Sequence, residues 1–401
     1  MLKTLLCGTA FLALAAAAGT AQAQVSNNVV KIGVMNDRSG VYADLAGEGS
    51  AIAARMAVEE FGGKVAGAPV EVVVADHQNK ADIAANTARQ WVDVDNVDVI
   101  ADVPNSAAAL AVQGITRDKK RIFLMSGPGS TDLTGKACSP YGFQWTYDNY
   151  AMAAGTGRAL VEQGKKNWYF ITADYAFGHS LEAETTNMVK QLGGTVKGNV
   201  RHPLGTSDFS SFLLQAQGSG ADVIGFANAG GDTINAVKQA AEFGVTQSGQ
   251  SLASLLLFIS EVHALGLEAA QGLMLTTGFY WDMDEQTRAW SAKFEQKHGK
   301  KPTMVQAGVY SAVRHYLKAV EAAGTDDADK VAAKMRELPV EDMFAKNGKI
   351  YPNGRMAHDM YLARVKKPSE SKGPWDYYQI VSTLPAATAF MDPAKTACAQ
   401  K

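Results

Sequence analysis

Residues 97–134 limit what this chain can fold into more than any other segment. Two short apolar runs, 97–101 and 121–126, flank a helix-like stretch at 107–117, and each run ends at a corner of small polar residues. Strand, corner, helix, strand, corner is the order of a parallel sheet, so both corners should open at its carboxyl edge, where open α/β sheets bind ligands. The corners at 104–106 and 127–131 offer hydroxyls, an amide and backbone N–H groups, but no base, metal ligand or nucleophile. They therefore predict binding of a small anionic group without reaction.

The same alternation extends over most of the chain. Strands are predicted at 29–34 and 69–75, with helices at 47–61 and 81–92, which gives a first parallel sheet of at least four strands. A second series begins near residue 150. Its strands are predicted at 167–172, 195–201, 223–227 and 255–259, the last ending at Ser260 and Glu261, and its first long helix at 180–192.

The remaining third of the chain predicts helices at 284–298, 306–323 and 326–338, then short β-like segments at 348–352, 361–365 and 377–381. The fold class is therefore α/β, with two Rossmann-like lobes. We expect lobe one at 24–145 plus 280–350. Lobe two, the hinge and the C-terminal tail should occupy 146–279 plus 351–401. Three crossings near 143–150, 275–282 and 348–360 would form a three-segment hinge.

The first 23 residues have the features of a signal peptide. Lys3 is followed by an apolar run at 5–18 and by an Ala-Gln-Ala cleavage site, so we expect cleavage after Ala23 and export to the periplasm. Cys7 lies too early to mark a lipoprotein. No later apolar stretch reaches the ~20 residues of a membrane span. The 38 basic and 40 acidic residues nearly balance, which argues against nucleic acid or an anionic membrane as a partner.

Two cysteines, Cys138 and Cys398, remain after the signal peptide. In an exported protein this even count predicts a disulfide, which would tie the C-terminal tail back to residue 138. The alternative is two unpaired thiols. Since free thiols are oxidised in such a compartment, the disulfide is favoured.

The usual signatures of catalysis are missing from the sequence. It has no G-x-S-x-G elbow and no H-E-x-x-H motif, and its seven histidines show no metal-ligand spacing. The glycines before Asp232 lack the P-loop lysine pattern. We therefore expect no enzyme activity, no cofactor and no metal. A secreted α/β hydrolase stays a weaker alternative, which would need a nucleophile with a base partner.

Several segments resemble a known family in order along the chain. KIGVMNDRSG at the first strand, ADHQN after the second, MSGPGSTDLTG at the second corner and ADYAFG in the second lobe are similar to periplasmic solute-binding proteins of ABC transporters. The most similar type is the branched-chain amino-acid (leucine/isoleucine/valine) binding class. The resemblance implies the type I periplasmic-binding-protein fold, closure around one small ligand, and delivery to a membrane permease.

The resemblance also assigns site residues in lobe one. Asn105 and Ser106 stand where the family has polar donors for a ligand carboxylate. Pro128 stands where a backbone carbonyl and the neighbouring N–H, here of Gly129, meet the ligand. Ser130 stands where the family has a hydroxyl group that contacts both the carboxylate and the amine of the ligand. From the residues alone, these are equally well helix caps and turn residues.

In lobe two, Phe177 falls on an aromatic wall position and Glu261 near the acidic residue that holds an α-ammonium. Ala229 stands where branched-chain binders often have an aromatic residue, and this departure resembles a branch that takes aromatic carboxylates such as hydroxybenzoates. Further wall candidates are Tyr42, Tyr147, Tyr150, Tyr175 and Trp281. The expected function is therefore a monomeric periplasmic receptor for a small carboxylate, either an aromatic acid or a branched-chain amino acid. An exported ligand sensor on the same fold is the alternative.

Overall fold

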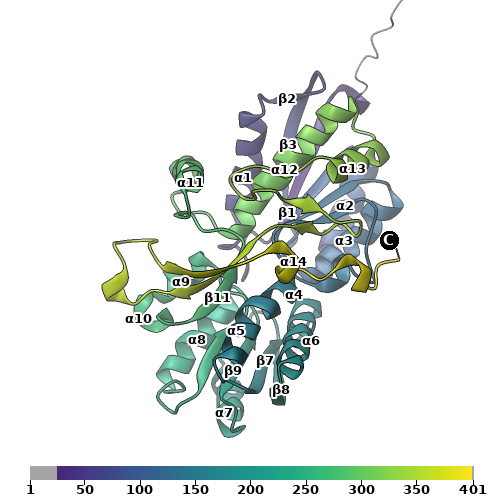
Figure 1. The fold of residues 1–401 in the computed structure, drawn as a ribbon. Coiled ribbons are helices and arrows are strands. Elements are labelled where there is room, and N and C mark those ends of the chain that lie inside the picture. Colours follow the sequence, from purple (N-terminus) through teal and green to yellow (C-terminus); the bar gives the residue numbers. More distant parts are fainter. Residues whose placement is uncertain (1–24, 400–401) are drawn as a thin grey trace, which may run out of the picture.

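The protein is described by a computed structural model that covers residues 25–399, so the expected signal peptide and its cleavage site lie outside the described residues. Figure 1 shows two α/β lobes joined by a narrow middle region. The predicted α/β class with two lobes is confirmed. Each lobe has a largely parallel sheet, and its central strands, such as Val30–Asn36 and Val223–Ala227, are apolar and buried because helices cover them.

Lobe one is built on a six-stranded sheet in the order β2-β3-β1-β4-β5-β6. Its pairs are parallel except for the β2–β3 hairpin. The strands are β1 (Val30–Asn36), β2 (Lys64–Val65), β3 (Ala68–Asp76), β4 (Val99–Asp102), β5 (Ile122–Met125) and β6 (Gly142–Gln144). The helices of this lobe are α1 (Gly47–Glu60), α2 (Ala81–Asp93), α3 (Ser106–Asp118), α11 (Glu285–His298), α12 (Met304–Ala323) and α13 (Ala328–Glu337).

Lobe two has a four-stranded parallel sheet in the order β10-β9-β7-β8. Its strands are β7 (Asn167–Ala173), β8 (Thr195–His202), β9 (Val223–Ala227) and β10 (Ser251–Ser254). Its helices are α4 (Asn149–Met152), α5 (Arg158–Glu162), α6 (Ala176–Gln191), α7 (Ser210–Gly218), α8 (Gly231–Glu242), α9 (Ile259–Leu265) and α10 (Leu267–Ala270), and a π-helical turn, Ala153–Gly157, joins α4 to α5.

Two predictions for lobe two were wrong. The strand expected at 255–259 is irregular backbone that enters α9, because the Glu261 carboxylate accepts the backbone N–H of Phe258 and caps a helix there. The helix expected from residue 180 starts four residues earlier, at Ala176. Phe177 therefore lies in the first turn of α6 and not in a loop.

The middle region contains an antiparallel sheet of β11 (Met274–Thr277), β14 (Met360–Val365) and β15 (Tyr378–Leu384), which lies between the lobes in Figure 1. A short hairpin of β12 (Lys349–Ile350) and β13 (Met356–Ala357) precedes it, and α14 (Ala386–Ala389) follows it. The predicted disulfide is confirmed: Cys138 and Cys398 are bonded, with their Cα atoms 5.6 Å apart, and they tie the C-terminal tail to lobe one.

Candidate functional site

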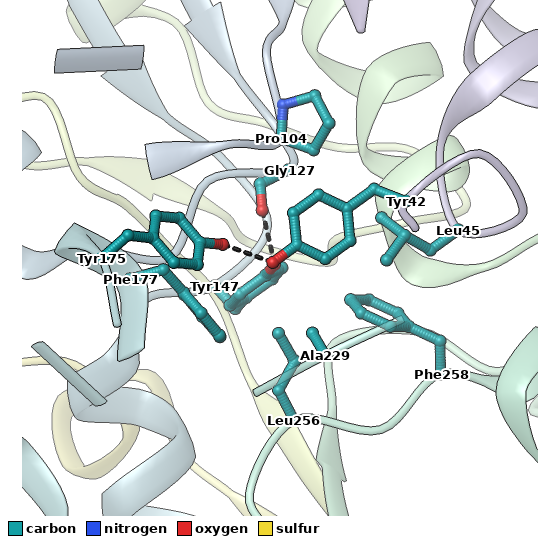
Figure 2. A pocket seen from close by; sticks show the side chains of 10 residues that line it. All are labelled: Tyr42, Leu45, Pro104, Gly127, Tyr147, Tyr175, Phe177, Ala229, Leu256 and Phe258. Atoms are coloured by element: carbon teal, nitrogen blue, oxygen red, sulfur yellow. Dashed lines mark hydrogen bonds between the residues drawn. The ribbon is translucent and has the colours of Figure 1, made fainter. Parts of the chain in front are cut away.

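A narrow cavity of about 10 Å³, with room for about one water molecule, lies between the two lobes. Its walls follow the carboxyl ends of strands in both sheets: β1, β4 and β5 in lobe one, and β7, β9 and β10 in lobe two. This is the edge that the order of strands and helices predicted as the ligand site. We call it the aromatic cavity; Figure 2 shows its lining residues, which are Tyr42, Leu45, Pro104, Gly127, Tyr147, Tyr175, Phe177, Ala229, Leu256 and Phe258.

The aromatic cavity is apolar apart from phenol hydroxyls and backbone groups. Five of its lining residues carry aromatic rings, and none of the described residues that line it has a charged side chain. The hydroxyls of Tyr42 and Tyr175 contact each other, and the Tyr147 hydroxyl donates to the carbonyl of Gly127. Burial raises the pKa of all three phenols well above the usual value. They are therefore neutral and able to donate hydrogen bonds.

The two polar corners of lobe one meet beside this cavity. The Oδ1 atom of Asn105 accepts the N–H groups of Ala107 and Ala108 at 3.0 and 3.1 Å and so caps α3. The backbone N–H of Ser130 donates to Oγ of Ser106 at 3.2 Å, which joins the corners. These three predicted residues do not line the aromatic cavity themselves, although Pro104 and Gly127, from the same corners, do.

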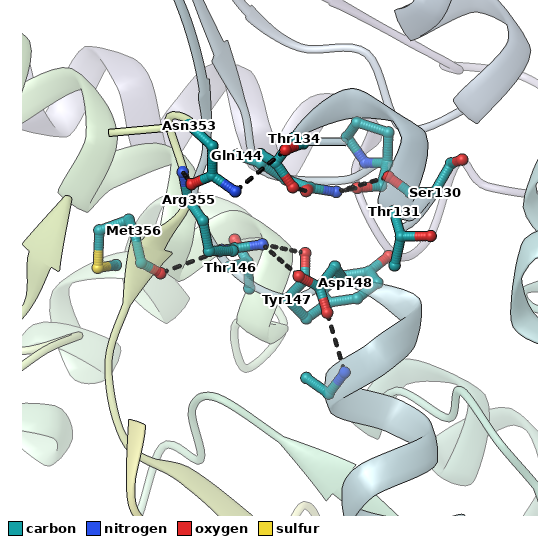
Figure 3. A network of polar contacts seen from close by, with 12 residues as sticks. Ser130, Thr131, Thr134, Gln144, Thr146, Tyr147, Asp148, Asn353, Arg355 and Met356 are labelled. Carbon is teal, nitrogen blue, oxygen red and sulfur yellow. Dashed lines mark hydrogen bonds and ion pairs between the residues drawn. The ribbon is translucent and has the colours of Figure 1, made fainter. Parts of the chain in front are cut away.

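Pro128 and Gly129 are fixed by neighbouring side chains from both lobes. The Gln144 amide donates to the carbonyls of Pro128 and Ser130 at 3.0 and 3.2 Å, and Thr134 donates to the Gln144 side-chain oxygen at 3.2 Å (Figure 3). A Cβ atom at Gly129 would lie 2.6 Å from Oδ1 of Asn149, so any larger residue would displace the Asn149 side chain. The Pro128 carbonyl is thus already hydrogen-bonded within the protein.

In lobe two, Phe177 and Ala229 line the aromatic cavity as expected, whereas Glu261 lies just behind its wall. One oxygen of the Glu261 carboxyl accepts the N–H of Gly230, and the other accepts the N–H of Phe258 at 3.0 Å. The side chain is buried, and this burial raises the pKa of Glu261 to about 8. At neutral pH this carboxyl is therefore largely protonated.

Tyr150 is not brought to the aromatic cavity. It lies in α4 and lines a separate cavity on the hinge side, together with Asp148 and Arg355. The buried Arg355 guanidinium donates to the carbonyls of Tyr147 at 2.7 Å and Met356 at 3.1 Å, and its Nη1 lies 3.7 Å from Oδ2 of Asp148 (Figure 3). Arg355 thus connects two hinge segments that are distant in the sequence.

Of the further wall candidates, Tyr42, Tyr147 and Tyr175 line the aromatic cavity, and Trp281 does not; its indole donates instead to the carbonyl of Trp375 at 2.8 Å. Sequence reasoning missed the apolar side chains of the wall, namely Leu45, Leu256 and Phe258. An apolar residue in a cavity wall has the same sequence pattern as one in the core, so no signal separated them.

The lobes are held in contact around the aromatic cavity. Besides the two phenols, the N–H of Gly231 donates to the carbonyl of Val41 at 3.0 Å, and the Thr131 hydroxyl donates to Glu184 at 3.0 Å. These bonds join lobe one to lobe two, so the structure is a closed form.

Within residues 25–399, the helices are each too short or too polar to cross a bilayer. The same residues contain no group of three or more His, Cys, Asp or Glu side chains arranged to hold a metal ion.

Comparison with known proteins supports this two-lobed architecture. The family described as "Periplasmic binding protein" matches residues 29–373. A periplasmic binding protein from Burkholderia mallei is 53% identical, with a TM-score of 0.92 over 93% of this chain and 99% of that one. A periplasmic ligand-binding protein of a branched-chain amino acid ABC transporter from Burkholderia xenovorans LB400 is 41% identical, with a TM-score of 0.83 over 92% and 99% of the chains. The "Leu/Ile/Val-binding protein homolog 6" of Brucella melitensis is 26% identical over 92% of this chain and 94% of its own length.

Proposed function

Because the chain belongs to the periplasmic binding protein family and has its type I fold, we propose that it binds a small aromatic carboxylate for an ABC importer. The ligand would be enclosed between the lobes and passed, chemically unchanged, to a membrane permease. Residues 1–23 would direct export and be removed after Ala23. The receptor would act as a monomer in the periplasm.

The composition of the aromatic cavity carries this proposal. Five aromatic side chains surround a narrow space of about 10 Å³. This is far below the ~300–1,000 Å³ of pockets for drug-sized ligands, so the lobes must part to admit a ligand, and the ligand should be small. Rings pack favourably against such walls, with pairs adding ~0.5–1.5 kcal/mol beyond area burial.

A carboxylate that leaves water needs replacement hydrogen bonds. The neutral phenols of Tyr42 and Tyr175 bond to each other, which leaves one of their two protons to donate into the cavity, while Tyr147 donates to the carbonyl of Gly127. The start of α3, next to Pro104, adds the favourable end of a helix dipole, worth ~0.3–1 kcal/mol, while the N–H groups of Ala107 and Ala108 are already accepted by Asn105. Asn105, Ser106 and Ser130 would support these donors by fixing the two corners.

A branched-chain amino acid is the second candidate, because relatives such as those from Burkholderia xenovorans LB400 and Brucella melitensis carry such names and Glu261 lies behind the wall. An α-ammonium group needs an ionised partner when it is buried. Both oxygens of Glu261 already accept backbone N–H groups, and burial raises the pKa of this carboxyl to about 8. Ala229 leaves room for a ring where such binders often have an aromatic residue. The geometry therefore favours the aromatic acid.

A thermal-shift screen followed by calorimetry tests the proposal. Benzoate and 4-hydroxybenzoate should raise the melting temperature, since a ligand that binds only the folded state stabilises it, and leucine, isoleucine and valine should not. An Ala229→Leu variant, which fills part of the cavity, should bind the aromatic acids at least tenfold more weakly. Binding of the three amino acids with no response to any aromatic acid would refute the proposal.

A further inference from the structure

The turn that follows β1 in lobe one is organised by the buried carboxyl group of Asp37. One of its oxygens accepts the backbone N–H of Gly40 and the other accepts that of Tyr42, both at 2.8 Å. The side-chain amide of Asn79 donates to the second oxygen as well. Asp37 therefore fixes the backbone that carries Val41 and Tyr42 toward lobe two.

This turn meets the start of α8 in lobe two. The N–H of Gly231, the first residue of α8, donates to the carbonyl of Val41 at 3.0 Å. The first N–H groups of a helix have no partner within the helix, and Gly230, the residue before α8, has no side chain that could accept one. A carbonyl of lobe one thus caps a helix of lobe two, and it does so only while the lobes are together.

Gly230 makes room for this close approach. Its φ angle is 64°, and a Cβ atom there would lie 2.2 Å from the carbonyl oxygen of Val41 and 2.8 Å from Cδ1 of Tyr42. Its N–H donates to the buried carboxyl group of Glu261. Each side of the contact is therefore positioned by a buried acidic side chain, that of Asp37 in lobe one and that of Glu261 in lobe two.

We propose that the turn at 37–42 and the glycine corner at 230–231 form a latch that holds the lobes closed even without a ligand. The bond between Val41 and Gly231 joins backbone to backbone, so nothing bound is needed to complete it. Neither Asp37 nor Gly230 lines the aromatic cavity, so both are positioning residues. Resting on the proposed function for its ligand, the latch sets the affinity, because apparent affinity scales with the fraction of protein in the binding form.

Fluorescence energy transfer measures closure without any ligand. Dyes are attached through Lys64→Cys in lobe one and Gln215→Cys in lobe two, both at exposed positions. With the latch intact, the ligand-free protein should show a closed population. Gly230→Ala should remove it, because the added methyl group meets the Val41 carbonyl only when the lobes close. Gly266→Ala is the matched control, since its φ angle is 75° but a Cβ atom there has no neighbour within 4 Å.

Calorimetry and stopped-flow kinetics with benzoate and 4-hydroxybenzoate measure the effect on binding. Gly230→Ala should bind about tenfold more weakly or worse, whereas Gly266→Ala should lose thermal stability and keep its affinity. Asp37→Asn retains one acceptor of the turn and replaces the other, so affinity should fall about threefold to fivefold through faster dissociation. Asp98→Asn is its control, because this buried lobe-one carboxyl accepts the Lys31 N–H at 2.8 Å, away from the latch.

Two results would overturn the latch: absence of a closed population in the ligand-free protein, or equal effects of Gly230→Ala and Gly266→Ala on the distance between the lobes. Equal effects of Asp37→Asn and Asp98→Asn on dissociation would overturn the role of Asp37. Failure of both acids to bind the unmodified protein would instead overturn the proposed function, and the distance measurements, which need no ligand, would still decide the latch.

Discussion

Tyr42 in lobe one and Tyr175 in lobe two contact each other through their hydroxyl groups across the aromatic cavity (Figure 2). Tyr42 follows β1 and Tyr175 immediately precedes α6, so this contact joins the carboxyl edges of the two sheets. The contact lies in the wall of the cavity, so the lobes that it joins are the same ones that enclose a ligand. Any ligand in this cavity therefore lies next to the bond that holds the lobes together.

The Tyr175→Phe variant tests this relationship. Loss of one hydroxyl bond removes ~0.5–1.5 kcal/mol from the closed form, so ligand affinity should fall roughly threefold to tenfold, mainly through faster dissociation. Stopped-flow fluorescence with a bound aromatic acid measures the rate. Tyr169→Phe, on β7 and outside the cavity, is the control. Unchanged dissociation in Tyr175→Phe would show that the contact does not hold the lobes closed.

The buried carboxyl of Glu261 should make stability depend on pH. Its folded-state pKa is raised to about 8 by burial, above the ordinary 4.5, so the fold disfavours the ionised form. Its contribution to stability is complete below about pH 4.5 and is lost as the pH rises through 8. Between these values, the unfolding free energy of the wild type should fall relative to Glu261→Gln by about 1.4 kcal/mol per pH unit.

Urea denaturation at several pH values between 5 and 8 measures this difference. Comparing slopes, and not absolute stabilities, removes the constant cost of replacing one carboxyl oxygen by an NH₂ group. Parallel curves for the two proteins would mean that Glu261 is ionised in the folded state across this range.

Removing Arg355 should destabilise the hinge strongly. Burial lowers the pKa of this guanidinium to about 10, so it is still charged at neutral pH, and it lies beside the buried Asp148. Loss of one partner from a buried pair leaves an uncompensated charge and costs ~3–5 kcal/mol. Arg355→Met should show this loss in chemical denaturation.

The double variant Arg355→Met with Asp148→Asn supplies the control. Since neither charge is then left unpaired, it should be destabilised by less than the sum of the single variants. Additive losses would instead indicate that Arg355 acts mainly through its bonds to the carbonyls of Tyr147 and Met356.

Reduction of the disulfide should lower stability without abolishing ligand binding. Cys138 and Cys398 are separated by 260 positions in the sequence, and the chain-entropy treatment gives ~5 kcal/mol for a loop of this size, with typical measured values of ~2–4 kcal/mol. The Cys138→Ser, Cys398→Ser double variant should melt at a lower temperature. Dithiothreitol should lower the melting temperature of the wild type only. An equal effect on both proteins would show that the bond is not formed in solution.

Local sequence signals predicted the backbone well where periodicity and corner residues agreed. The corners at Asn105 and Ser130 were found because polar residues after an apolar run mark the carboxyl end of a strand, and both now cap the element that follows. The prediction of a strand at 255–259 was wrong because its apolar residues are buried in a cavity wall and not in a sheet. Leu256 and Phe258 line the aromatic cavity, and Glu261, three residues after Phe258, caps α9.

The sequence by itself determined the two lobes, the sheet edge at which they meet and the pair of cysteines, because each of these follows from local periodicity, corner composition or residue count. Only the tertiary structure decided which side chains face the space between the lobes. It placed Tyr150 on the hinge side and put Glu261 behind the wall. It also left the Tyr378 hydroxyl without a partner among the described residues. The reason is physical: an apolar residue has the same sequence pattern whether it packs in a core or lines a cavity. Which of the two it does depends on how segments that are distant in the sequence pack together.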